Sequence, residues 1–483
     1  MQQLDLRPII PSLIVALTGL IVLLVQAYTP KGKAAPSAAL SLYGLAAAMA
    51  SVVMLMGEHA VLTTGGTVVA DALSLLLQAV LIAVTMAVVL LSPGYLRAIG
   101  GERGEYYTLI LFSLVGMMGL VASVELISIF VALEIMSVAL YALAGLRRDK
   151  IESQEAAIKY FVTGSFSSAF FLYGIALLYG VSGSTMLARL PDAIRTPAEG
   201  MALLPVLGVG FLLVGFAFKV ASVPFHAWAP DVYEGAPTTV TAFMAAGVKV
   251  AAFGALLRVF GEGLPGDGAL AGHWRSAVAV LALVTMVLGN LGALAQRSVK
   301  RMLAFSSIAH AGYLMAALVA VEYVAAEAIV FYLVAYAAVN LGGFGAMAAL
   351  ARDGREPARL EDFHGLAERR PALAAAMTIF LISLTGIPVS AGFVGKFYLF
   401  KAAVDAGYAV LAVVGVLTSV ISAYYYLRVV VAMYMYEPAG EDPWGEVGVG
   451  AAAALIVSAV VVLALGVYPA PLLALAKAAA NVL

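Results

Sequence analysis

The sequence predicts an all-α polytopic membrane protein with about fourteen transmembrane helices, two of them discontinuous. Its composition is the first observation: 63% of the 483 residues are hydrophobic, 11% are charged, and the mean hydropathy is +1.02. A soluble domain of this length has far less apolar surface. The second observation is that apolar runs of about 20 residues, long enough to cross roughly 30 Å of hydrocarbon, recur along the chain. The third is that glycine and proline interrupt two of these runs beside ionisable residues.

The apolar runs follow one another with short connections. They fall near residues 8–28, 36–56, 69–91, 106–123, 124–146, 155–180, 203–226, 237–260, 274–296, 300–321, 325–350, 373–400, 407–436 and 447–470. We expect three N-terminal helices (1–105), a first five-helix unit (106–262), a second five-helix unit (263–436) and a fourteenth helix (437–483). Because five is an odd number, a repeat of this kind has inverted topology, as in many secondary transporters.

Basic residues predict the orientation of the chain. The loops that follow odd-numbered spans hold most of them: Lys31, Lys33, Arg97, Arg103, Arg147, Arg148, Lys150, Arg297, Lys300, Arg301, Arg352, Arg355, Arg359, Arg369 and Arg370. The loops after even-numbered spans hold few, chiefly Arg189, Arg195 and Arg275. By the positive-inside rule the odd loops are cytoplasmic and both termini lie on the other side. The N-terminus lacks a basic region and a small-residue cleavage site, so we expect a retained first span.

Two broken segments mark the expected functional centre. The first, from 208 to 258, contains Lys219, His226 and Lys249 and is interrupted at Pro224, Pro230, Gly235 and Pro237. The second, from 373 to 400, is interrupted at Gly386, Pro388, Gly392 and Gly395, and Lys396 follows. Non-helical backbone at membrane depth is tolerated only against protein or water, and in transporters such breaks mark ion sites.

A carboxylate and a lysine are candidates for a switchable pair. Glu134 is near the middle of the fifth span, and Lys219 lies just before the first break. Two unit charges about 4 Å apart interact by roughly 4 kcal/mol at an effective dielectric of 20, so forming or breaking such a pair would change the proton affinity of the lysine. The alternative for Glu134 is a neutral carboxyl group that donates to a backbone carbonyl.

Three further lysines and one histidine are candidate proton carriers. Lys249 is central in its span with no acidic neighbour on its own helix, and burial of that kind disfavours the charged form. Lys396 and Lys159 lie closer to span ends, where a long side chain can instead extend to the interface. His310 lies mid-span one turn after Ser306 and Ser307, either as a relay or as a satisfied core residue. Glu125 is expected to cap a helix, and His226 and Asp231 to anchor the turn after the first break.

Several function classes are excluded. The chain has no cysteine, so it offers no thiolate ligand for an iron–sulfur cluster and no disulfide. No HExxH motif, P-loop or metal-spaced histidine cluster is present, and Gly208, Gly210 and Gly215 do not have the spacing of a dinucleotide fingerprint. The net charge of -1 and pI near 6.5 give no indication of nucleic-acid binding. We therefore expect no cofactor in this chain.

Four stretches resemble the antiporter-like subunits of respiratory complex I, and among them the N type. They are KVASVPFHAWAPDVYEGAPTTVTAF, EAAIKYFVTGSFSSAFFLYGIALLYG, RMLAFSSIAHAGYL and GIPVSAGFVGKF, to which Glu134 can be added. The resemblance covers essentially the whole chain. It implies a fourteen-helix fold in which spans four to eight and nine to thirteen form an inverted repeat with spans seven and twelve discontinuous. It also implies a place in the bacterial cell inner membrane.

The resemblance implies roles for particular positions. Glu134 matches the family's span-five glutamate, Lys219 its span-seven lysine, Lys249 its central span-eight lysine, and Lys396 the lysine of span twelve in the N type. A proton is then expected to pass from the cytoplasmic side to Lys219, through water and His310 to Lys249, and out through Lys396.

The implied partners are other membrane-arm subunits and a hydrophilic arm that holds FMN and iron–sulfur clusters; quinone is involved only indirectly. Two rival interpretations remain open. A subunit of a multisubunit cation/proton antiporter shares the fold and the Glu–Lys pair, although the span-six and span-ten stretches favour complex I. A structural membrane spacer would instead tolerate neutralisation of its buried charges.

Overall fold

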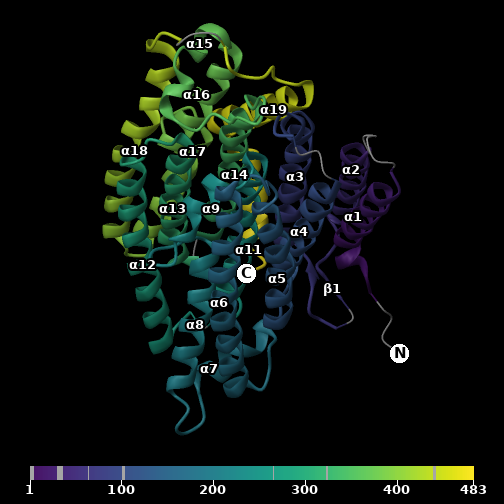
Figure 1. Cartoon of the computed structure of the whole chain (residues 1–483). Helices are drawn as coiled ribbons and strands as arrows, with labels where there is room; N and C mark the ends of the chain where they lie inside the picture. The colour runs from purple at the N-terminus through teal and green to yellow at the C-terminus, as the bar shows by residue number, and fades with distance from the viewer. Residues whose placement is uncertain are drawn as a thin grey trace.

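The computed structural model describes residues 5–29, 36–63, 65–100, 104–264, 266–321, 325–438 and 442–483. Within these residues the chain is a bundle of helices, with one short antiparallel strand pair, β1 (Val61–Leu62) and β2 (Val69–Ala70) (Figure 1). Eleven helices in this part of the chain are long and apolar enough to cross a membrane. The all-α membrane fold is therefore confirmed. Lys31, Lys33 and Arg103, which contributed to the predicted orientation, lie outside the described residues.

The N-terminal layer and the first repeat follow the predicted order. The layer consists of η1 (Arg7–Ile9), α1 (Ile10–Tyr28), α2 (Ser37–Leu55) and α3 (Ala72–Ala98). The first repeat contains α4 (Gly104–Ala122), α5 (Leu126–Ala144), α6 (Ile151–Ser182), the connecting η2 (Leu187–Arg189) and α7 (Leu190–Arg195), α8 (Leu203–Lys219), α9 (Trp228–Gly235), α10 (Thr238–Phe243), the π-helical turn η3 (Met244–Val248) and α11 (Lys249–Gly261).

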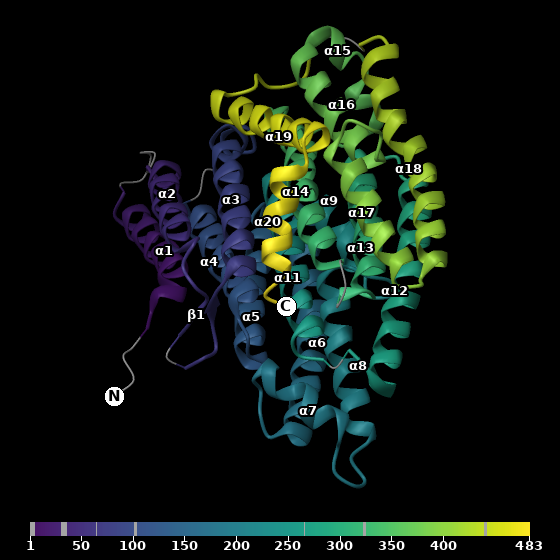
Figure 2. The same ribbon diagram turned by 180° about the vertical axis from the view of Figure 1, so that it is seen from behind.

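The second repeat and the C-terminus complete the bundle. The repeat contains α12 (Gly268–Leu294), α13 (Val299–Leu318), α14 (Ala326–Ala349), η5 (Leu360–Phe363), α15 (Leu366–Arg369), α16 (Pro371–Thr385), α17 (Ala391–Asp405) and α18 (Ala409–Met435), and α19 (Val449–Val467) and α20 (Ala470–Ala480) follow it. The predicted single last helix is thus two helices. Figure 2 shows α19 lying across the upper end of the bundle on the side nearer the viewer, and α20 running beside α14 toward the C-terminus.

Both predicted breaks are present, and their sequences explain them. The helix α8 ends at Lys219, and Ala221 then takes a left-handed conformation with φ 58° ahead of Pro224. The helix α16 ends at Gly386, whose φ of 87° suits a residue without a side chain, and its amide donates to the carbonyls of Ile382 and Ser383. After this turn the Ser390 hydroxyl caps α17. Spans seven and twelve are therefore each two half-helices.

The centre of the molecule is a fully buried span. Every residue from Thr238 to Phe260 is buried, although this segment contains Lys249 and Arg258. The outer helices instead expose large apolar side chains, for example Phe166 on α6 and Val420 on α18, as expected for contact with lipid or neighbouring subunits. The Nη2 atom of Arg258 donates to both carboxylate oxygens of buried Asp71, the residue that caps α3, at 2.6 and 2.8 Å. This pair fastens the central span to the N-terminal layer.

Candidate proton pathway

The first break leaves backbone carbonyls at the end of α8 without helical partners, and Lys249 binds one of them. The Lys249 ammonium group donates to the carbonyl of Val220, which follows the last residue of α8, and to the carbonyl of Ser307 on α13 at 3.2 Å. The C-terminal end of a helix carries a partial negative charge, so it stabilises a cation. The π-helical turn directly before Lys249 is a form often found at functional sites.

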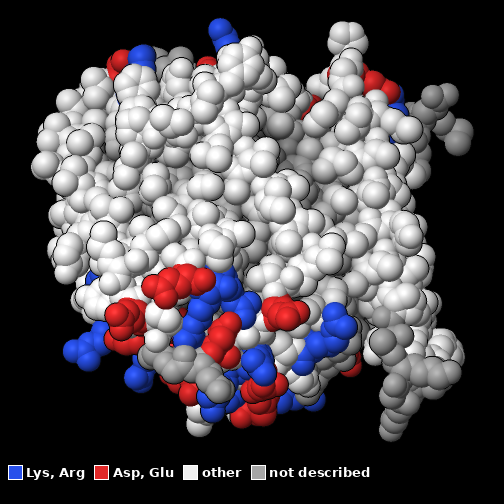
Figure 3. All heavy atoms as spheres, turned by 90° about the horizontal axis from the view of Figure 1, so that it is seen from above, with Lys and Arg blue, Asp and Glu red and all other residues white. Residues whose placement is uncertain are grey.

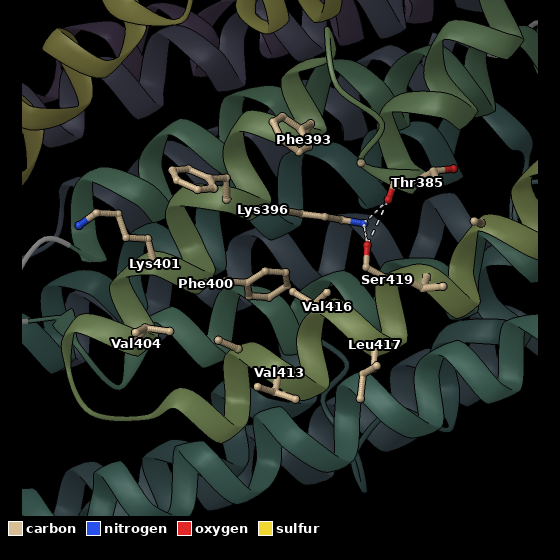
Figure 4. A pocket seen from close by; sticks show the side chains of 15 residues that line it. Thr385, Phe393, Lys396, Phe400, Lys401, Val404, Val413, Val416, Leu417 and Ser419 are labelled. Atoms are coloured by element: carbon tan, nitrogen blue, oxygen red, sulfur yellow. Dashed lines mark hydrogen bonds between the residues drawn. The ribbon is translucent and has the colours of Figure 1, made fainter.

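The second break is capped in the same way by Lys396. Its ammonium group donates to the carbonyls of Leu384 and Thr385 at 2.8 and 3.0 Å and to the Ser419 hydroxyl at 2.7 Å. Figure 4 shows the contacts of Lys396 with Thr385 and Ser419 at the inner end of an apolar cavity of about 870 Å³ between α17 and α18. Lys396 is buried, so it does not extend to the interface as the sequence alternative allowed. The ammonium group satisfies its three donors on uncharged oxygens.

Lys219 is buried, but its partner differs from the one expected. The Lys219 ammonium group donates to the Ser137 hydroxyl of α5 at 2.8 Å and lies 5.3 Å from the ring centroid of Tyr160. Glu134, one turn before Ser137, is half-buried and accepts instead from the Ser168 hydroxyl of α6 at 2.5 Å. The predicted direct pair of Glu134 and Lys219 is therefore absent. Glu134 and Ser137 lie one turn apart on α5, and Ser137 rather than Glu134 contacts Lys219 of α8.

A small cavity lies between the Ser168 hydroxyl, which contacts Glu134, and Lys219. Ser168 and Lys219 both line it, and its volume is about 10 Å³, close to the lower limit for one water molecule. Glu134 thus reaches Lys219 through hydroxyl groups and this cavity, which allows electrostatic influence without an ion pair.

His310 lies in a cage of tyrosine side chains. Its Nδ1 atom contacts the Tyr332 hydroxyl and its Nε2 atom lies 3.1 Å from the Tyr426 hydroxyl. The rings of Tyr313 and Tyr336 lie 5.3 Å away, centroid to centroid. Sequence reasoning missed these tyrosines, because aromatic residues in an apolar span read as core or lipid-facing. The spacing of Tyr332 and Tyr336, four residues apart on one helix face, is the signal that was available.

One face of α13 links the two lysines. The Ser307 carbonyl contacts Lys249, His310 follows one turn later, and one turn beyond it the Tyr313 ring centroid lies 5.1 Å from the Lys396 ammonium group. Residues three apart are on the same side of a helix. The structure therefore brings Lys249, His310 and Lys396 together along this face.

Lys159 is not part of this buried set. It is half-exposed and pairs with Glu155 at 2.5 Å and with Asp231 at 2.6 Å. Asp231 also pairs with Arg301 of α13 at 2.7 Å, so it anchors α9 to two neighbouring helices. Glu125 caps α5 as predicted, accepting from the Ser128 amide at 2.6 Å.

A buried carboxylate at the charged end of the molecule was not foreseen. Figure 3 looks onto that end, where acidic and basic side chains gather over one part of the surface. Glu356, in the loop after α14, accepts from Tyr95 at 2.9 Å, from Arg147 at 2.5 Å and from Thr238, and pairs with Lys300 at 3.5 Å. Burial alone would raise the pKa of Glu356, but Lys300, Thr238, Arg147 and Tyr95 together hold this pKa below 4.5. Glu356 therefore stays ionised and joins the two repeats.

Across the described residues no group of three or more histidine, cysteine, aspartate or glutamate side chains could hold a metal ion. The buried cations of the spans include Arg258, which is paired with Asp71, and Lys219, Lys249 and Lys396, which are not paired with a carboxylate among the described residues. What these three lysines can do chemically is take up and release protons.

Comparison with known proteins gives a consistent result. A family model described as "NADH:quinone oxidoreductase/Mrp antiporter, TM" matches residues 123–422. NADH-quinone oxidoreductase subunit N of Trichlorobacter lovleyi is 41% identical over all of this chain and 98% of the relative. A chain of respiratory complex I from Thermus thermophilus aligns with a TM-score of 0.83 and 36% identity over 96% of this chain and 99% of that one. A chain of the Mrp complex from a Dietzia species has the same TM-score at 25% identity, with 99% and 97% covered.

Proposed function

Because the chain belongs to the NADH-quinone oxidoreductase subunit N family, the antiporter-like membrane subunits of respiratory complex I, we propose that its buried lysines carry protons across the membrane. As such a subunit it is part of a proton-translocating oxidoreductase, and we propose that the redox centres are held by other subunits. The proposed carriers are Glu134, Lys219, Lys249, His310 and Lys396. Lys159, an ion-paired residue in the N-terminal part of α6, is proposed only as a peripheral member.

The contacts of the three buried lysines carry this proposal. Among the described residues, no carboxylate lies within ion-pair distance of Lys219, Lys249 or Lys396, and each ammonium group donates to hydroxyl or carbonyl oxygens. A lysine held this way can lose its proton without leaving an unpaired buried carboxylate behind. Ionisable side chains inside a membrane cost about 2.5–3.5 kcal/mol each on insertion scales, so several of them on neutral partners favour a transport role over a structural one.

We propose that protons pass from Lys219 to Lys249 and then to Lys396, with Glu134 setting the affinity of Lys219. The first step follows the end of α8, since Lys219 is its last residue and Lys249 binds the carbonyl of Val220. The second step follows the α13 face through His310, which the sequence had instead placed between Lys219 and Lys249. The direction, from the cytoplasmic side toward the opposite side, is taken from the family.

The domain division is proposed with the boundaries expected from the sequence. Residues 1–105 form the N-terminal layer, 106–262 and 263–436 the two repeats, and 437–483 the C-terminal part, expected as the fourteenth helix. The matching order of long, broken and long helices in the two units supports it.

The chain is a multi-span membrane protein, and we propose the bacterial cell inner membrane as its location. The charged end that contains Arg147, Lys300 and Glu356 is then cytoplasmic, and both termini are on the opposite side. Its proposed partners are the lipid bilayer and other membrane-arm subunits, with FMN and iron–sulfur clusters in the hydrophilic arm. Quinone is reduced elsewhere in the complex, and its reduction affects this chain only indirectly, by driving proton transfer.

The test compares Lys219→Ala and Lys396→Ala in the intact complex with Lys401→Ala. Lys401 is on the same helix as Lys396, but it is exposed and pairs with Asp405, one turn away. We expect Lys219→Ala and Lys396→Ala each to lower the rate of coupled quinone reduction by at least about tenfold in fully assembled complex. Losses of this size are typical when a positioned proton-transfer group is removed. Lys401→Ala should keep the native rate. If Lys219→Ala and Lys396→Ala both kept the native proton stoichiometry, the proposal would be refuted.

A subunit of a multisubunit cation/proton antiporter remains the second candidate, because the family model covers both classes and the Dietzia Mrp chain shares the fold. Relatives named for complex I are more similar to this chain, at 41% identity against 25%. Purification of the native complex separates the two candidates. Flavin and iron–sulfur subunits should be present in it, and their absence would favour the antiporter.

A further inference from the structure

Between the last two lysines lies a continuous chain of hydroxyl and imidazole groups. The Ser306 hydroxyl contacts the Tyr426 hydroxyl, which lies 3.1 Å from Nε2 of His310, and Nδ1 of His310 contacts the Tyr332 hydroxyl. All four side chains are almost completely buried. They come from α13, α14 and α18, so three separate helices of the second repeat are needed to align them.

The two ends of this chain lie beside the two lysines. Ser306 directly precedes Ser307, whose carbonyl accepts from Lys249 at 3.2 Å. At the other end the Tyr332 ring presses on Gly395, the residue before Lys396, so closely that any side chain at position 395 would collide with it. The chain therefore begins one residue before a contact of Lys249 and ends against the residue before Lys396.

We propose that Ser306, Tyr426, His310 and Tyr332 form the proton conduit between Lys249 and Lys396. The inference rests on the proposed function and specifies its least defined step. Each lysine would leave its carbonyl partners to reach the nearer end of the conduit.

The transfer balances at every group. Lys249 gives a proton to the Ser306 oxygen while the Ser306 proton moves to Tyr426, the Tyr426 proton moves to Nε2 of His310, and the Nδ1 proton moves to Tyr332, which releases its own toward Lys396. Each of the four intervening side chains gains one proton and loses one, Lys249 loses a proton and Lys396 gains one, so no oxidant or reductant is required. A neutral imidazole has one donor and one acceptor nitrogen, which is why one tyrosine must donate to His310 while the other accepts. Rotation of the hydroxyl groups and of the ring restores the starting arrangement.

A neighbouring tyrosine shows what a purely structural partner looks like. The Tyr425 hydroxyl donates to the amide oxygen of Asn290 at 3.0 Å, and the Asn290 amide nitrogen donates to Tyr313 and to the backbone. An amide does not exchange protons readily, so this branch is unsuited to conduction. Tyr425 is adjacent to Tyr426 and equally buried, which makes it a matched control.

The experiment uses the intact complex with Tyr426→Phe, Tyr332→Phe and Tyr425→Phe in this subunit. We expect the first two variants to assemble and to lower coupled turnover by about tenfold or more, since positioned proton-transfer groups contribute roughly 10²–10⁴-fold. The solvent deuterium isotope effect on turnover should rise in these variants, because proton transfer becomes slower than the other steps. Tyr425→Phe should keep the native rate and isotope effect.

Three outcomes overturn the conduit. They are native turnover and proton stoichiometry in both assembled variants, a slower rate without a larger isotope effect, and an equal loss in Tyr425→Phe. If a phenylalanine variant does not assemble, Ser306→Ala applies the same test with a smaller change of shape. Lys249→Ala distinguishes the two levels of the proposal: loss of pumping in that variant with native tyrosine variants rejects only the conduit, whereas native pumping in Lys249→Ala rejects the proposed function.

Discussion

The two repeats share a backbone arrangement but hold their lysines with different side-chain chemistry. In the first repeat Lys219 contacts one serine hydroxyl, and the nearby Glu134 is half-buried at the edge of the bundle. In the second repeat Lys396 contacts two free carbonyls and a hydroxyl, and His310 is enclosed by tyrosines. The helix breaks supply carbonyl oxygens in both repeats, so the difference between them comes from the neighbouring side chains.

The helix packing confirms that the comparison is between equivalent positions. Glycines of the first helix of each repeat lie against the second helix at matching sites: Gly116 and Gly119 against Met136 and Ala132, and Gly289 and Gly292 against Ala309 and Phe305. The same number of residues separates the partners in both repeats. In this register Ser137 corresponds to His310. The position that holds Lys219 by a hydroxyl in one repeat is therefore an imidazole in the other.

The largest expected effect concerns the contact that joins the repeats. Glu356→Gln leaves the buried Arg147 and Lys300 without their carboxylate, which should cost about 3–5 kcal/mol. Because the pKa of Glu356 is lowered on folding, its contribution is complete above pH 4.5 and is lost as the pH falls below that value. The midpoint temperature of the complex, measured at several pH values, should be lower in the variant at pH 7 and should decline less on acidification. Equal midpoints at pH 7 would show that the repeats do not depend on this contact.

The next largest effect distinguishes the two lysine sites directly. Ser137→Ala removes the hydroxyl that Lys219 contacts, while Ser419→Ala leaves Lys396 with two carbonyls. A hydrogen bond to a charged group contributes roughly 1.5–3 kcal/mol, so Ser137→Ala should slow coupled turnover by about tenfold or more and Ser419→Ala by only a few-fold. Turnover of the assembled complexes provides the comparison. Equal losses would mean that the carbonyls at the second break do not hold Lys396.

A somewhat smaller effect tests the shared architecture. Gly116→Ala and Gly289→Ala each place a methyl group against the backbone of the second helix in their repeat. Overpacking of this kind costs typically about 1–3 kcal/mol, and the loss should be similar in the two variants. Thermal stability of the complex is the measurement. A large loss of thermal stability in only one of the two variants would show that Gly116 and Gly289 are not equivalent positions.

The smallest effect is expected at Lys159, whose side chain is half-exposed between Glu155 and Asp231. Exposed ion pairs contribute little, so Lys159→Gln should change coupled turnover by no more than about twofold. A tenfold loss in assembled complex would instead place Lys159 in the pathway of the first repeat.

The sequence predicted the fold and the buried cations because both depend on local patterns. Glycine and proline in apolar runs located the two breaks, and their residues now form the turns at Pro224 and Gly386. Span length and hydropathy set the number of crossings. The bend between α19 and α20, near Tyr468 and Pro469, was missed because the apolar run continues up to it.

The site was less predictable because it depends on distances between helices. Helical spacing placed Glu134 and Lys219 on candidate faces, but it could not show that Ser137 and Ser168 would take up their hydrogen bonds. Nothing in the sequence showed that α9 folds back to bring Asp231 beside Lys159 of α6. Glu356 is in a loop, where a lone carboxylate gives no indication of burial.

The central claim is that protons pass between the repeats through Lys249. The most direct test is the number of protons moved per electron by complex carrying Lys249→Ala, reconstituted in vesicles. We expect coupled turnover to fall by at least about tenfold, and the remaining turnover to move fewer protons per electron than the native complex. A native ratio at a native rate, in fully assembled complex, would contradict the account.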